Sequence, residues 1–228
     1  LPPTPATFDP MAVPTRTEAL TLLMSTSPSP RLLQHVTVVA EVAAFLAHRA
    51  ARAGVGVDRR LVETAALLHD VDKALPPTHP LRELGHGPAG AAWLTEAGHP
   101  ELARTLIAHP VTRFTDADAE TWVEQAPLEE RIVTYADKRA TQRVVSLEQR
   151  FDRWRAKHPR YRAKLDCAYA VARHLEDAVC STVGVRPTEV ERLRWVEDAL
   201  ARAQAAGVID APLPTAPAVP APADTSAA

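Results

Sequence analysis

Four side chains that are good metal ligands lie in segments whose other residues form apolar helical patterns. His35 lies in a run whose apolar residues recur every three to four positions. His69 and Asp70 end the apolar run AALL, and Asp137 lies among apolar residues in RIVTYADKR. A buried carboxylate is unfavourable unless it is paired or bound to a metal, and imidazole and carboxylate groups suit divalent transition metals. Each group alone could be structural, but three separate segments that supply such groups predict a metal site.

Two further histidines lie between these segments in the chain. His86 is in LGHGPAG, where the flanking glycines allow the backbone to approach a ligand closely. His109 is the last residue before Pro110, at the end of an apolar helical run. Taken singly, each could be an exposed loop histidine or a cation at a helix C-terminus. Together with the first four groups they give the order H…HD…H…H…D.

The elements that must hold these groups are nearly all helical. Apolar residues repeat with helical spacing, and prolines and glycines mark the expected helix boundaries. We find no segment with the alternating pattern of a strand and no two-residue hairpin signal. The fold class predicted from the sequence is therefore all-α. The expected helices span residues 16–24, 31–53, 58–74, 88–98, 100–109, 128–157, 160–183 and 187–206.

The composition excludes several classes of protein. The 228 residues carry a formal net charge of −2, so no nucleic acid or anionic membrane partner is indicated. No apolar run reaches the roughly 18 residues of a membrane span, and the first residues do not resemble a secretory signal. Cys167 and Cys180 lie on one expected helix, too far apart to pair, and are expected to be buried or half-buried thiols. We therefore expect a cytoplasmic protein.

At this point the order of ligands resembles that of the HD-domain metal-dependent phosphohydrolases. The matching residues are His35, His69-Asp70 in HDVDK, His86, His109 and Asp137 in YADK. The two intermediate histidines, with HGPAGA and LIAHP around them, are similar to the two-metal branch that splits diadenosine tetraphosphate symmetrically. In that branch Thr usually follows the second histidine, whereas Pro110 follows it here. The resemblance implies an HD-domain helical bundle over about residues 20–150.

The composition and this resemblance together divide the chain into four parts. Residues 1–14 are expected to be a loose lead-in and residues 15–150 the HD phosphohydrolase domain. Residues 151–210 are expected to form a helical extension packed on that domain, either as a simple cap or as a substrate lid or dimer surface. Residues 211–228 contain mostly Ala, Pro and small polar residues and are expected to be a disordered tail. A homodimer is left open.

The resemblance also implies roles for individual residues. Asp70 would bridge two divalent ions (iron, manganese, cobalt, nickel, magnesium or zinc) and would be catalytic together with Lys73. His35, His69 and Asp137 would hold one ion, and His86 and His109 would complete the other. A metal-bound hydroxide would attack the phosphorus of a phosphoester or phosphoanhydride. The phosphate-binding candidates are Lys73, Arg139 and Arg143, with Arg113 a weaker candidate, whereas Asp72 is expected to be a solvated acid.

Three functions remain open from the sequence. The first is a metal-dependent phosphohydrolase that acts on a nucleotide or another small phosphate compound. The second is a mixed-valence di-iron oxygenase on the same HD scaffold, whose ligands look alike. The third is a non-catalytic nucleotide-sensing HD protein, which the complete ligand set disfavours.

Overall fold

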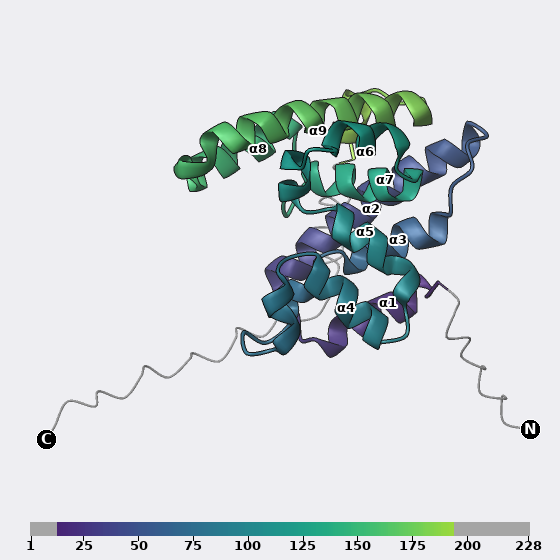
Figure 1. The fold of residues 1–228 in the computed structure, drawn as a ribbon. Helices are drawn as coiled ribbons and strands as arrows, with labels where there is room; N and C mark the ends of the chain where they lie inside the picture. The colour runs from purple at the N-terminus through teal and green to yellow at the C-terminus, as the bar shows by residue number, and fades with distance from the viewer. Residues whose placement is uncertain (1–12, 194–228) are drawn as a thin grey trace, which may run out of the picture.

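The computed structural model describes residues 13–193, and no strand forms among them beyond an isolated bridge between Ala140 and Val144. The predicted all-α fold is therefore confirmed (Figure 1). None of the described helices is long and apolar enough to cross a bilayer. The α-helices are α1 (Arg16–Ser25), α2 (Pro30–Arg52), α3 (Arg59–Leu68), α4 (Pro88–Glu96), α5 (Ala103–Ala108), α6 (Ala119–Gln125), α7 (Leu128–Lys138), α8 (Leu147–Lys157), α9 (Arg162–Val183) and α10 (Pro187–Glu191). Short 3-10 turns are η1 (Val71–Ala74), η2 (Pro80–Leu84), η3 (Pro100–Leu102), η4 (Val111–Thr115) and η5 (Pro159–Tyr161).

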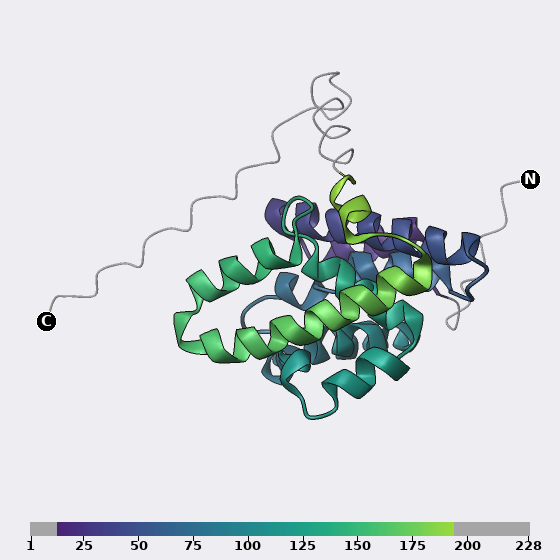
Figure 2. The same cartoon turned by 90° about the horizontal axis from the view of Figure 1, so that it is seen from above.

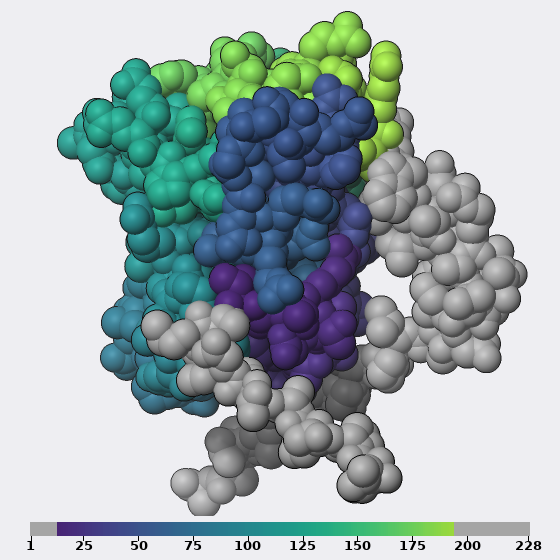
Figure 3. Space-filling view, turned by 90° about the vertical axis from the view of Figure 1, so that its right-hand side faces the viewer, coloured from purple at the N-terminus to yellow at the C-terminus, as the bar shows by residue number. Residues whose placement is uncertain are grey.

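Three helices, α2, α3 and α7, form the centre of the bundle. They pack against one another, and α5 lies against α7 while α1 lies against α3. The helices α8 and α9 form an antiparallel pair that crosses one end of the bundle, as Figures 1 and 2 show. In Figure 3 the green side chains of this pair cover that end of the molecule. Since α9 packs on α6, α7 and η4, the C-terminal pair is continuous with the core.

Local sequence signals explain where the helices begin and end. Ser29 caps α2 by accepting a hydrogen bond from the Leu32 amide, and Asp58 caps α3 in the same way. Ser146 and Gln149 form a reciprocal capping box at the start of α8. At the other end of the domain, α9 stops at Gly184, whose φ of 65° lies in the left-handed region.

Two expected helices are shorter in the structure. The helix expected over 58–74 ends at Leu68 and continues as the turn η1. The helix expected over 128–157 is two helices, because the chain turns at residues 139–146 before the capping box starts α8. The sequence pattern also missed α6. Residues 1–12 and 194–228 lie outside the described residues. The expected tail and the part of the expected helix 187–206 beyond residue 193 fall there.

The two cysteines are both free and both lie on α9. Cys180 is buried, but Cys167 is exposed, so the expectation of two buried or half-buried thiols is wrong for Cys167.

Candidate metal centre

The structure brings all six predicted metal ligands together around Asp70. The carboxylate oxygen Oδ2 of Asp70 lies 3.4 Å from His35 Nε2 and 3.5 Å from His69 Nε2. The other oxygen, Oδ1, lies 3.5 Å from His86 Nε2 and 3.4 Å from His109 Nε2. Each oxygen of one carboxylate therefore faces its own pair of imidazoles, which is the arrangement of a carboxylate that bridges two ions.

Asp137 adds a second carboxylate to the first of these two groups. Its Oδ1 atom lies 3.2 Å from His35 Nε2 and 3.7 Å from His69 Nε2. The first group thus has four candidate ligands. The second group has three, and its His86 side chain is 37% exposed, whereas the other histidines are nearly inaccessible. Solvent or a substrate can therefore reach the second group most easily.

All four histidines present the same ring nitrogen to the centre. The Nδ1 atom of each faces an oxygen at 2.7–3.0 Å: the Thr141 carbonyl for His35, the Ala66 carbonyl for His69, the Asp72 carboxylate for His86 and the Leu106 carbonyl for His109. Because these oxygens are acceptors, each Nδ1 carries the proton in a neutral ring. The Nε2 lone pair then points at the centre, and such outer partners fix the orientation of metal-bound imidazoles.

Two of the histidines owe their position to a helix C-terminus. His69 follows the last residue of α3, and His109 follows the last residue of α5. Each Nδ1 contacts the carbonyl three residues earlier, at 2.7 Å. Carbonyls in the last turn of a helix have no intrahelical partner. The ends of α3 and α5 therefore both satisfy their own backbone and orient a ligand.

A glycine allows the loop of His86 to approach His109. Gly87 has a φ of 91°, a conformation that other residues rarely adopt. A Cβ atom at this position would lie 2.7 Å from Pro110 Cγ and 2.8 Å from the Leu106 carbonyl oxygen. The Nε2 atoms of His86 and His109 are 3.1 Å apart as a result of this close approach.

Asp72 is not the solvated acid that we expected from the sequence. It is 6% exposed, and its Oδ2 atom lies 2.9 Å from His86 Nδ1. The reason is the end of α3 at Leu68, since the turn η1 directs the side chain inward instead of along a helix surface. Asp72 therefore orients a ligand and belongs to the centre.

The donor set fits divalent cations. His69 Nε2 and Asp70 Oδ1 are buried and have no hydrogen-bond partner among the described residues. The Nε2 lone pairs of His86 and His109 face each other at 3.1 Å. Buried polar atoms without partners are unfavourable, and a cation on each side of Asp70 would satisfy all of them. Mixed imidazole and carboxylate donors suit iron, manganese, cobalt, nickel or zinc.

The charges of the centre favour a cation as well. Against the effect of burial, His69 holds the pKa of Asp70 well below its usual range, and Lys138 does the same for Asp137. Burial lowers the pKa of His109 to about 4, so this ring is neutral. Burial would also lower the pKa of His69, but the nearby carboxylates of Asp70 and Asp137 raise it to about 9. A proton on His69 and an ion at its Nε2 therefore exclude each other.

Two positively charged side chains at the centre, Lys138 and Arg150, were not predicted from the sequence. Lys138 is buried, and its Nζ atom donates to Asp137 Oδ2 and to the His109 carbonyl, both at 2.6 Å. Arg150 Nη2 lies 3.5 Å from Asp137 Oδ1. The motif YADK could have indicated Lys138, but nothing in the sequence indicated Arg150, because only the turn at residues 139–146 brings α8 back to the centre.

Of the predicted phosphate-binding residues, only Lys73 contacts the centre. Its Nζ atom lies 2.7 Å from Asp70 Oδ2, and its side chain is 49% exposed. Arg143 is exposed, and its side chain makes no hydrogen bond or ion pair among the described residues. Arg113 is paired with the surface carboxylates Asp116 and Asp118.

The expectation that Arg139 binds phosphate needs correction. Arg139 has no exposed surface, and its guanidinium donates to Tyr135, Glu176 and the Val145 carbonyl. Arg139 is the C-cap of α7, and its side chain reaches Glu176 on α9. Arg139 is therefore part of the connection between helices.

Comparison with known protein families gives one match. Residues 32–142 match the HD domain, from the first turn of α2 to just beyond α7. The match contains all six candidate ligands and stops before α8. No curated protein and no solved structure matches the chain. Residues 32–142 are therefore similar to the HD domain family, and the His/Asp cluster within them could hold metal ions.

Proposed function

We propose that this protein is a two-metal phosphohydrolase whose substrate is a nucleotide or another small phosphate compound. The observation that carries the proposal is the position of Asp70, whose two oxygens each face a separate pair of histidine nitrogens. When bound, the ions would supply Lewis acidity and a hydroxide nucleophile near neutral pH. The remaining work of catalysis falls to the side chains around them.

Two cations beside the centre support a phosphate substrate. Lys73 is half exposed next to Asp70, and Arg150 lies next to Asp137. Arg150 Nη2 is ion-paired with Asp137, and Arg150 Nε has no hydrogen-bond partner among the described residues. Such donors bind phosphoryl oxygens and stabilise negative charge that develops during transfer. We assign phosphate binding to Lys73 and Arg150.

The same cations make the phosphohydrolase more favourable than the di-iron oxygenase, since oxygen chemistry does not require them. A non-catalytic sensor would not need a ligand group that a substrate can reach, whereas His86 in the second group is 37% exposed. We therefore keep hydrolysis as the function, with diadenosine tetraphosphate as the first substrate to test, because of the likeness to that branch.

The test is phosphate-ester hydrolysis by the manganese-loaded and cobalt-loaded protein. Substrates would be diadenosine tetraphosphate, ADP and AMP, with chromatography of the products. We expect turnover that a chelator abolishes, and an Asp70→Asn variant that folds but loses at least about 100-fold in kcat. Oxygen uptake by the reduced iron-loaded protein, without hydrolysis of any phosphate compound, would support the oxygenase instead. Unchanged turnover in Asp70→Asn would refute the site.

A further inference from the structure

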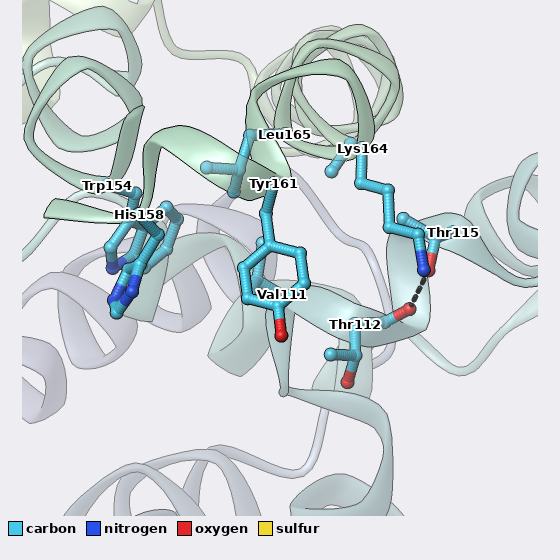
Figure 4. Close-up of a pocket in the computed structure, with 9 residues that line it drawn as sticks. Val111, Thr112, Thr115, Trp154, His158, Tyr161, Lys164 and Leu165 are labelled. Carbon is cyan, nitrogen blue, oxygen red and sulfur yellow. Dashed lines mark hydrogen bonds between the residues drawn. The ribbon is translucent and has the colours of Figure 1, made fainter. Parts of the chain in front are cut away.

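A cavity of about 440 Å³ lies between η4 and the C-terminal helices. Its lining is mostly apolar, and the aromatic rings of Trp154, His158 and Tyr161 contribute to it. Figure 4 shows Trp154 and His158 beside each other on one side and Lys164 and Thr115 on the other, with Tyr161 between them. The volume lies within the range of about 300–1,000 Å³ that is typical of small-molecule sites.

Two features place the cavity near the metal centre, although none of the six candidate ligands lines it. The cavity residue Val111 is two positions after His109, so the turn η4 connects a ligand directly to the cavity wall. The second feature is a side-chain relay from Asp137. Arg150 lies 3.5 Å from Asp137, and its guanidinium lies over the Trp154 ring at 4.5 Å from the centroid. One side chain, Arg150, thus separates a metal ligand from the aromatic wall.

The aromatic wall is well fixed. The Trp154 ring packs edge-on against Phe151, with centroids 5.0 Å apart, while Arg150 covers it. Phe151 has no exposed surface and also packs against Tyr169. Tyr161 differs, because it is 44% exposed although it lines the cavity. A large aromatic side chain that remains exposed beside a cavity can pack on a ligand.

We propose that this cavity binds the base of a nucleotide while the phosphate of the same molecule lies at the metal centre. The inference rests on the proposed phosphohydrolase function and adds a substrate class to it. Aromatic side chains stack on any nucleobase, and Arg150 lies between the ligand Asp137 and the Trp154 ring of the cavity. The polar groups at the edge, Thr115 and Lys164, can bond to the heteroatoms of a base or ribose.

Specificity for the base of the substrate would then depend on residues that follow the family match. Trp154, His158 and Tyr161 all follow residue 142, where the HD domain match ends. The HD domain then supplies the metal centre, and the α8–α9 pair supplies the base site. The extension has a role in substrate choice rather than only in packing.

The test is equilibrium binding to the manganese-loaded full-length protein, measured by calorimetry with AMP, ribose 5-phosphate and inorganic phosphate. We expect AMP to bind about 5- to 100-fold more tightly than ribose 5-phosphate, the range of one base-stacking contact. Tyr161→Ala should remove most of this difference and leave ribose 5-phosphate binding unchanged. Tyr161→Phe is the matched control, since it keeps the ring and should keep the preference. Thermal unfolding confirms that both variants fold.

The outcomes separate this inference from the proposed function. Equal affinities for AMP and ribose 5-phosphate would overturn the base site and leave the phosphate function standing. A preference for AMP that survives both Tyr161→Ala and Trp154→Leu would also overturn it, because the base would then bind elsewhere. No binding of any of the three compounds would overturn the phosphate function itself.

Discussion

At the residue scale, both candidate ion sites depend on Asp70. Its two oxygens divide four imidazoles into two pairs, and its carboxylate is ionised because of the charge on its neighbours. His35, His69 and Asp137 form a nearly closed shell, whereas the second group is smaller and more accessible. The two sites should therefore differ in occupancy and can be separated by substitution.

The first prediction concerns metal content. A His86→Ala/His109→Ala variant should lose the ion of the second group and keep the other, because Asp137 belongs to the first group alone. Metal analysis of protein purified without chelator should give about two ions per chain in the wild type and about one in the variant. His48→Ala is the control, since His48 is exposed and lies outside the centre. One ion in both proteins would refute the second site.

The second prediction concerns pH. In the ion-free protein the pKa of His69 is about 9, so below that pH the ring carries a proton that an ion must displace. Metal affinity should therefore rise with pH up to about 9 and then level off. Calorimetry at pH 7 in two buffers with different ionisation enthalpies should give release of about one proton per ion bound at the first group. Equal heats in the two buffers would contradict this assignment.

At the element scale, the sequence predicts most helices but misses the two interruptions that build the site. Helical periodicity indicates α2, α4, α5 and α9 well, because each has one apolar face and a clear start or stop. The same periodicity predicts that the helices continue past Leu68 and past Lys138, where α3 and α7 end, because the next residues are also compatible with a helix. The native breaks depend on tertiary contacts, such as the His35 side chain against the Thr141 carbonyl.

The ligands were therefore easier to predict than their surroundings. The six ligands, four histidines and two aspartates, could be read directly from their order in the chain. The contacts of Asp72, Lys138 and Arg150, however, depend on where the backbone turns. One local signal was available. Ser146 and Gln149 have the spacing of a capping box and mark the start of α8 within the helix that we expected to be continuous.

The third prediction concerns the loop before α4. Gly87→Ala should push the His86 loop away from α5, because the added Cβ would overlap Pro110 and the Leu106 carbonyl and would favour a different φ. We expect about 1–3 kcal/mol lower stability and a loss of metal at the second group. Chemical unfolding and metal analysis measure the two effects. The control is Gly85→Ala, which also has a positive φ but meets no atom within 4 Å. Equal metal loss in both variants would show that strain alone is responsible.

At the scale of the whole molecule, a buried polar network joins α7 to the C-terminal helices α9 and α10. Arg139, at the end of α7, donates to Glu176 on α9 at 3.2 Å and to the Pro187 carbonyl at the start of α10 at 3.3 Å. Tyr135 and Cys180 complete the network, and burial raises the pKa of both. Because α9 also carries one wall of the proposed base site, this network positions that wall relative to the metal centre.

The last prediction tests this connection. Arg139→Met should lower the stability of the full chain by about 3–5 kcal/mol, because it leaves the buried Glu176 carboxylate without its partner. Burial already raises the pKa of Glu176, so the lone carboxyl should take up a proton, and the loss should be smaller at acidic pH. An Arg139→Met/Glu176→Leu variant should recover much of the stability, since apolar side chains can replace a buried pair. Chemical unfolding at pH 5 and pH 8 measures all three proteins. If Arg139 bound phosphate instead, Arg139→Met would weaken phosphate binding without this loss of stability, and Glu176→Leu would not compensate for it.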